Sequence, residues 1–452
     1  MKLKSSLLIL LIIGLLFVGL EKVYASGADA GHSLNPTILI GIAMMLATAK
    51  IMGEVFERLG QPSVLGELLS GIVLGNLILF GINSIEQFKT DQVIAALAEL
   101  GVIILLFEVG LESDLKEMVE VGWSSLLVAV LGVIAPFLLG WGISAYFLPE
   151  EALLAHIFIG ATLCATSVGI TARVFKDLGK LGTREARIIL GAAVIDDVLG
   201  LLILAVVAGS IRAASSGTEL ALLDIGLIAA KSLLFLVFAL LIGNLLMPRL
   251  LRGLGRFESR GVLLTLAISF CMLLAWVAAQ VGLAPIVGAF AAGLVLDEVN
   301  YKPSRGRTER DLHELLQPVS TFLVPIFFVL MGMKVELYKF ARVDILGFAL
   351  VLTLGAIVGK QVCSLGVLER GLDRLTVGIG MIPRGEVGLI FAGIGASLML
   401  PTAKGALEPV IGSGTFSAVV IMVLITTLVT PVALKWSLRR SKATETNQGS
   451  SE

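Results

Sequence analysis

Residues 191–204 read GAAVIDDVLGLLIL, an apolar run of helix length that contains two adjacent carboxylates, Asp196 and Asp197. The rest of the chain is equally apolar: its 452 residues are 57% hydrophobic and only 15% charged, and the mean hydropathy is +0.97. Soluble domains do not have this composition. The run therefore predicts a helix inside a lipid bilayer, where the two aspartates need an explanation.

Apolar segments of about 20 residues follow one another along the chain, separated by short polar loops. They are continuously apolar rather than alternating, and hydrocarbon requires each segment to satisfy its own backbone, so helices are expected and strands are not. We expect an all-α polytopic membrane protein with about 13 transmembrane helices, arranged as two inverted six-helix repeats plus a linker helix. The segments cover approximately residues 36–53, 63–82, 93–110, 123–148, 152–172, 188–210, 221–247, 261–281, 284–298, 315–333, 344–368, 375–399 and 408–434.

The first residues have the pattern of a signal peptide. Lys2 and Lys4 precede a Leu/Ile core, and the small residues Ala25 and Ser26 follow it. We predict a signal peptide over residues 1–25, and an uncleaved first helix is the alternative. Either way residue 26 lies outside, and the membrane domain extends over 26–437.

Basic residues concentrate in alternate loops, which the positive-inside rule assigns to the cytoplasm. This distribution predicts an outside N-terminus and a short cytoplasmic polar tail over 438–452. The family resemblance described below implies a bacterial inner membrane as the location, and an internal membrane is the alternative. The clustered basic residues are Arg173, Lys176, Lys180, Arg184, Arg187, Arg249, Arg252, Arg256, Arg260, Lys302, Arg305, Arg307, Arg310, Lys435, Arg439, Arg440 and Lys442.

Several classes of function are disfavoured. The formal net charge of −1 does not indicate a nucleic-acid partner. No glycine-rich phosphate loop is present, which argues against an ATP-driven pump. The three cysteines and three histidines lie far apart, so neither a disulfide framework, a bound cofactor nor an enzyme's metal centre is expected. They are Cys164, Cys271, Cys363, His32, His156 and His313. The composition favours a protein driven by an ion gradient.

The two aspartates favour an ion or proton pathway, because a charged carboxylate at the bilayer centre costs several kcal/mol. Neighbouring helix positions diverge by about 100°, so one partner cannot satisfy both. Lys360 lies deep in the segment 344–368 and needs an anion. We hypothesise that Asp196 pairs with Lys360 in a coupled titrating unit, while Asp197 faces water and alternately holds a proton or a cation. An ion pair that only fastens helices together is the alternative.

Two segments carry polar interruptions near their middle. ATLCATSVGITAR (161–173) contains Thr162, Thr166, Ser167 and Gly169, and VGIGMIPRGEVGLIF (377–391) contains Pro383, Arg384, Gly385 and Glu386. These segments are the fifth members of the two predicted halves, so we expect two broken, crossing helices that form a midplane site. Close packing of small residues is the alternative, although it does not explain the charges.

Roles at this site follow from the chemistry of hard cations, which prefer oxygen ligands. Asp197, Thr166, Ser167, unwound carbonyls and water are the expected shell for sodium. Arg384 and Glu386 are expected to neutralise the facing ends of the broken helices.

The chain resembles the monovalent cation/proton antiporters, in the bacterial branch that includes sodium/proton exchangers and the membrane half of potassium-efflux systems. The resemblance covers nearly all of residues 36–437. It is carried by QPSVLGELLSGIVLG (61–75), ELGVIILLFEVGLESDL (99–115), SVGITARVFKDLGKLGTREARIILGAAVIDDVLGLLIL (167–204), LAPIVGAFAAGLVL (283–296), PIFFVLMGMKVEL (325–337) and GMIPRGEVGLIF (380–391).

This resemblance implies a homodimer in the lipid bilayer with elevator-type alternating access. A transport bundle (121–212 and 342–437) would move against a dimerisation scaffold (36–110 and 221–334). Asp196, Asp197 and Lys360 match the acidic pair and membrane lysine of members that exchange sodium for protons electrogenically. We expect exchange of cytoplasmic sodium, and also lithium, for external protons. The nucleotide-binding domain of the potassium-efflux relatives is not expected.

Other functions stay open at this point. A potassium/proton antiporter is the first alternative, because selectivity depends on cavity geometry. A passive cation channel would not couple its flux to protons. An intramembrane aspartyl protease would need catalytic aspartates on separate helices, whereas Asp196 and Asp197 are adjacent.

Overall fold

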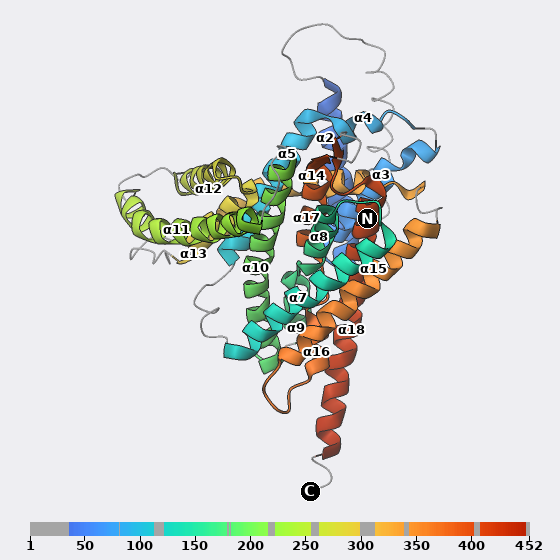
Figure 1. The fold of residues 1–452 in the computed structure, drawn as a ribbon, viewed down its shortest axis with the longest axis vertical. Coiled ribbons are helices and arrows are strands. Elements are labelled where there is room, and N and C mark those ends of the chain that lie inside the picture. Colours follow the sequence, from blue (N-terminus) through green and yellow to red (C-terminus); the bar gives the residue numbers. More distant parts are fainter. Residues whose placement is uncertain are drawn as a thin grey trace, which may run out of the picture. The chain divides into compact units, whose positions relative to one another are not determined.

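The computed structural model shows helices almost throughout the part of the chain that it describes (Figure 1). Eight helices within that part are long and apolar enough to cross a membrane, which confirms an all-helical polytopic membrane fold. The count of about 13 helices and the inverted repeat stay predictions. The predicted signal peptide lies outside the described residues. These are residues 36–80, 82–112, 122–178, 180, 182–215, 222–254, 262–298, 312–338, 343–401 and 407–448.

The chain divides into two compact units. The first contains the described residues up to Ile104 together with Pro318–Tyr338. The second contains Leu105–Gln317 and Lys339–Glu452. These two units are not the predicted transport bundle and scaffold, and that division stays a prediction.

The first unit is a set of packed helices. A Cβ on Gly71 would overlap the Val329 carbonyl oxygen, so the absence of a side chain lets α3 and α14 approach closely. Asn76 follows the last residue of α3, and its Nδ2 donates to the carbonyls of Ile72 and Val335, both at 2.8 Å. It thus joins the end of α3 to the residues that follow α14. Its elements are α2 (Pro36–Arg58), α3 (Ser63–Gly75), η1 (Leu77–Phe80), α4 (Glu86–Thr90), the first part of α5 (Gln92–Glu112) and most of α14 (Leu312–Met333).

The second unit holds all the candidate site residues. Its final helix runs on past the predicted membrane boundary at 437, so the first part of the predicted tail is helical. The helices are α7 (Gly122–Phe147), α8 (Leu153–Cys164), α9 (Val168–Asp177), α10 (Arg184–Ser215), α11 (Leu222–Leu254), α12 (Val262–Gln280), α13 (Pro285–Glu298), α15 (Val343–Val362), η3 (Cys363–Gly366), α16 (Arg374–Gly380), α17 (Gly385–Ser397) and α18 (Ser413–Gln448).

Close packing through small residues joins α7 to its neighbours. A Cβ on Gly140 would lie 2.9 Å from the Cα of Gly160 in α8, and a Cβ on Gly359 in α15 would lie 2.8 Å from the Cα of Pro136. Lipid is as apolar as these side chains, so dispersion contacts rather than exclusion from water hold the helices together.

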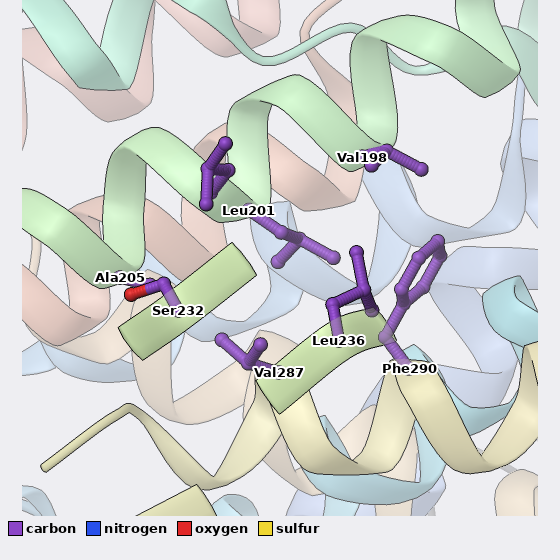
Figure 2. Close-up of a pocket in the computed structure, with 8 residues that line it drawn as sticks. Val198, Leu201, Ala205, Ser232, Leu236, Val287 and Phe290 are labelled. Carbon is purple, nitrogen blue, oxygen red and sulfur yellow. The ribbon is translucent and has the colours of Figure 1, made fainter. Parts of the chain in front are cut away.

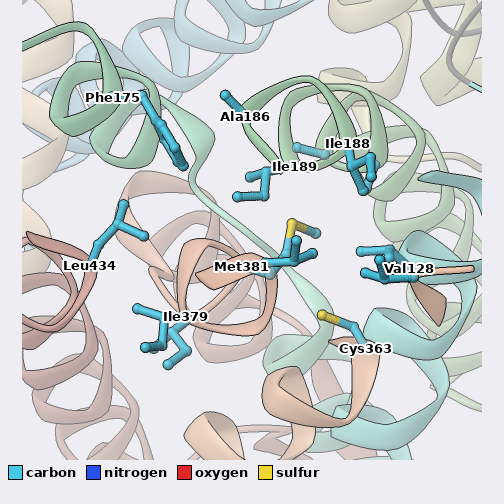
Figure 3. Close-up of a cluster of buried hydrophobic side chains, with 14 of the residues drawn as sticks. Val128, Phe175, Ala186, Ile188, Ile189, Cys363, Ile379, Met381 and Leu434 are labelled. Atoms are coloured by element: carbon cyan, nitrogen blue, oxygen red, sulfur yellow. The ribbon is translucent and has the colours of Figure 1, made fainter. Parts of the chain in front are cut away.

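A cluster of buried apolar side chains lies within the second unit (Figure 3). It brings together Val128 of α7, Phe175 of α9, Ile189 of α10, Ile379 of α16 and Leu434 of α18. Side chains from five helices, which come from three separate stretches of the chain, thus share one cluster.

One connection departs from the all-helical expectation. Strands β1 (Met399–Pro401) and β2 (Leu407–Pro409) pair antiparallel, with Leu400 opposite Glu408. The expectation that strands are absent is therefore wrong for this connection. It rested on the backbone requirement inside hydrocarbon, which does not apply to a short connection between two membrane helices, here α17 and α18.

Candidate functional site

Both predicted interruptions break a helix. In the first segment α8 ends at Cys164 and α9 begins at Val168, and residues 165–167 between them are not helical. In the second, α16 ends at Gly380 and α17 begins at Gly385. Each break frees backbone groups that a continuous helix would pair, and these need other partners.

The two breaks lie against each other. The backbone N–H of Ser167 donates to the carbonyl of Pro383 over 2.8 Å. Gly385 has a φ of +39°, and a Cβ there would overlap the side chain of Ser167. A glycine is therefore required at the start of α17, both for its backbone angle and for the space it leaves.

Arg384 joins the second break to the first. Its side chain is fully buried and donates to the carbonyls of Cys164 at 3.3 Å and Ala165 at 2.8 Å, at the end of α8. It also donates to Ala356 of α15 at 3.0 Å. The last carbonyls of a helix carry its negative partial charge, so the guanidinium compensates the end of α8. Glu386, expected to share this role, lies in the first turn of α17, and its side chain is outside the described part.

Two threonines that sequence reasoning missed hold the ends of the second break. Thr171 of α9 donates through Oγ1 to the carbonyl of Gly380 at 2.6 Å, and Oγ1 of Thr427 in α18 accepts from the N–H of Gly385 at 3.3 Å. Each threonine interrupts an apolar stretch, but so does Thr426, whose hydroxyl bonds back to its own helix. The sequence contains no signal that separates these cases.

The two aspartates have different surroundings. Asp196 of α10 forms an ion pair with Lys360 of α15, with Nζ 3.0 Å from Oδ1 and 3.2 Å from Oδ2, and both side chains are fully buried. Asp197, the next residue on α10, is partly accessible. Their divergence on the helix thus gives one carboxylate a buried cation and the other a partly open position.

Thr166 carries a buried oxygen that has no hydrogen bond. Its side chain is 1% exposed, and its Oγ1 lacks a hydrogen-bond partner among the residues that the structure describes. Ser167 is equally buried. Thr162 differs, because its hydroxyl donates to the carbonyl of Phe158 at 2.9 Å within α8. An unsatisfied buried hydroxyl is costly, and in a break it is a candidate ligand.

A small pocket lies beyond Asp197 along α10 (Figure 2). Apart from Ser232, its lining is apolar, and the Ser232 hydroxyl donates to Ile228 of its own helix. The pocket therefore offers no ligand for an ion. The lining residues are Val198, Leu201, Leu202, Ala205, Ser232, Leu236, Val287 and Phe290.

Comparison with known proteins shows which family the chain belongs to. The sequence profile described as "Sodium/hydrogen exchanger, transmembrane" matches residues 42–440. The chain belongs to the sodium/hydrogen exchanger family. The high-affinity Na(+)/H(+) antiporter NhaS3 of Synechocystis is 37% identical, over 93% of this chain and 95% of that protein. The Na(+)/H(+)-K(+) antiporter GerN of Bacillus cereus is 35% identical, over 88% of this chain and 95% of its own length.

A solved exchanger has the same fold. The sodium proton antiporter MjNhaP1 of Methanocaldococcus jannaschii superposes with a TM-score of 0.67, at 16% identity, over 90% of this chain and 98% of that one. The predicted family is therefore confirmed, and this exchanger is a multi-pass integral membrane protein.

Proposed function

We propose that this exchanger is a secondary active sodium/proton antiporter in which Asp197 binds either a proton or sodium, and also lithium. Family membership and the similarity to antiporters such as NhaS3 support this activity. Cytoplasmic sodium leaves as external protons enter, so the proton gradient drives export.

The different surroundings of the two aspartates carry the proposal. Asp196 already has the Lys360 ammonium within 3.0 Å, whereas Asp197 is partly accessible on the same helix turn. A carboxylate in a membrane needs a proton, a cation or a donor, and one site can hold only one of the first two at a time. Competition at Asp197 is then sufficient to couple the two ions.

Side-chain oxygens and water complete the proposed shell. Thr166 supplies the buried hydroxyl without a hydrogen-bond partner among the described residues, and Ser167 lies next to it. Three of the carbonyls at the breaks already have donors, since those of Cys164 and Ala165 accept from Arg384 and that of Pro383 accepts from the Ser167 N–H. We therefore assign sodium to carboxylate and hydroxyl oxygens rather than to these carbonyls.

Electrogenic exchange follows if sodium also draws Asp196 away from Lys360. Lys360 would then lose its counter-ion and release a proton, and proton charge would cross in excess of sodium charge. We further propose elevator-type access in a homodimer, with the transport bundle and scaffold over the residues predicted from sequence. The N-terminus would lie outside and the C-terminus in the cytoplasm of a bacterial inner membrane.

Potassium is the second candidate ion. The similarity to GerN, named a Na(+)/H(+)-K(+) antiporter, supports it. A site built from a few carboxylate and hydroxyl oxygens selects between alkali ions through its size and number of ligands.

Proton flux in liposomes tests the proposal. Purified protein is reconstituted with a pH-sensitive dye inside, and sodium, lithium, potassium or choline is added outside. We expect sodium and lithium to move protons, choline to move none, and Asp197→Asn to abolish the response, because an amide cannot exchange a proton for a cation.

The Glu185→Gln variant, at the first turn of the same helix, is the matched carboxylate control and should keep the wild-type response. Sodium uptake without opposing proton movement would reveal a channel instead. Full activity of Asp197→Asn would remove the proposed carrier residue.

A further inference from the structure

The second break is fixed at both ends by hydroxyls from other helices. Thr171 on α9 donates to the last carbonyl of α16, and Thr427 on α18 accepts from the first N–H of α17. Both threonines are buried, at 0% and 1% exposure. One hydroxyl acts as a donor and the other as an acceptor, as the two opposite helix ends require.

Other threonines of α18 behave differently. The hydroxyl of Thr426 donates to the carbonyls of Met422 and Val423, and that of Thr430 donates to Thr426, all within one helix. This back-bonding is the usual way a membrane helix satisfies a threonine. Thr427 instead bonds across to α17, so its hydroxyl contributes to contact between helices.

Displacement of the second break would reach the proposed ion ligands. Gly385 follows Arg384 directly, and Arg384 holds the carbonyls of Cys164 and Ala165 just before Thr166. Ser167 donates to Pro383 within the break and is pressed against Gly385. A shift at either end of the break therefore passes to the first break by contact.

We propose that Thr171 and Thr427 are positioning residues for cation binding, which hold the ends of the second break so that Arg384 keeps Thr166 and Ser167 in place. This inference rests on the proposed function. Neither threonine touches the ion. Loss of the Thr427 hydroxyl would leave the N–H of Gly385 unpaired at a buried helix start, and loss of the Thr171 hydroxyl would leave the Gly380 carbonyl unpaired.

Isosteric and conservative substitutions test the role. Thr427→Val and Thr171→Val keep the shape and remove the hydroxyl, while Thr427→Ser and Thr171→Ser retain it. Thr426→Val, at the position directly before Thr427 in α18, is the matched control. In proteoliposomes we expect each of the two Val variants to raise the apparent KM for sodium roughly fivefold while Vmax changes little, since one positioning hydrogen bond is lost. The Ser variants and Thr426→Val should behave as wild type.

Backbone hydrogen exchange gives a readout independent of transport. In purified protein, Thr427→Val should speed exchange of the Gly385 amide, and Thr426→Val should not. Unchanged KM and unchanged exchange in Thr427→Val would overturn the proposal, as would an equal effect of Thr426→Val. If one Val variant does not fold, the Ser variant at the same position and hydrogen exchange in the Val variant of the other threonine decide the question. Absence of sodium-driven proton flux in wild-type protein would instead overturn the proposed function. The hydrogen-exchange result would still show whether Thr427 holds the Gly385 amide.

Discussion

The backbone groups freed at the two helix breaks are paired by different kinds of side chain. At the first, the helix-end carbonyls of Cys164 and Ala165 are held by a cation, Arg384, and a buried hydroxyl on Thr166 has no hydrogen-bond partner among the described residues. At the second, the carbonyl end and the N–H end each have a threonine hydroxyl from another helix. The second break also supplies the cation that the first one uses.

This difference assigns the breaks distinct tasks. A break whose last carbonyl and first N–H each bond to another helix is suited to act as a rigid support. A break that retains an unsatisfied buried oxygen stores a cost that a bound ion can relieve. The first break would therefore provide ligands for the transported ion, and the second would hold them in place.

Replacing Arg384 should have the largest effect, because it serves both breaks. Arg384→Ala removes the donors to three buried carbonyls and should lower the free energy of unfolding by roughly 3 kcal/mol, with transport reduced at least ~10-fold. Thermal unfolding and proton flux measure the two quantities. Arg384→Lys should recover only part of each, since an ammonium cannot reproduce the planar fork of donors.

Exposed Arg374, at the start of α16, provides the control. Arg374→Ala should behave as wild type. Equal stability of Arg384→Ala and Arg374→Ala would show that the first break does not depend on the cation.

Adding a methyl group to Gly385 tests how closely the breaks adjoin. Gly385→Ala would overlap the side chain of Ser167 and strain a backbone with φ of +39°, so we expect a loss of roughly 2 kcal/mol in stability. Ser167→Gly in the same chain should recover part of the loss. Gly412→Ala is the control, because its added methyl would meet nothing within 4 Å. A fully stable Gly385→Ala would mean that the breaks are further apart.

Removing the Thr166 hydroxyl should have the smallest effect on stability, and one of opposite sign. Thr166→Val deletes a buried hydroxyl that none of the described residues pairs, so we expect stability to rise by about 1 kcal/mol while the apparent KM for sodium rises roughly fivefold. Thr162→Val, whose hydroxyl bonds within its own helix, should change neither value much. If Thr166→Val binds sodium as well as wild type, the first break does not supply this ligand.

Much of this arrangement could be predicted from sequence. Apolar length specified the helices, because hydrocarbon leaves the backbone no other local solution. Polar interruptions located both breaks, and a lysine deep in one helix indicated the partner of Asp196, since a buried ammonium requires an anion.

Contacts between distant segments that involve no buried charge pair could not be predicted in the same way. Thr171, Thr427 and Thr426 look alike in sequence, and only the packing of α9 and α18 against the second break separates them. The carbonyls that Arg384 binds depend on how the two breaks approach. The hairpin of β1 and β2 was missed because it lies in the short connection between α17 and α18, where the rules for lipid-embedded segments do not apply.

Proton release on ion binding tests the central claim most directly. Purified protein in weakly buffered detergent solution is mixed with sodium chloride, and the pH is followed with a dye. Wild-type protein should release protons in a saturable way with sodium but not with choline, and Asp197→Asn should release none. Saturable sodium binding by wild-type protein without proton release would contradict competition at Asp197.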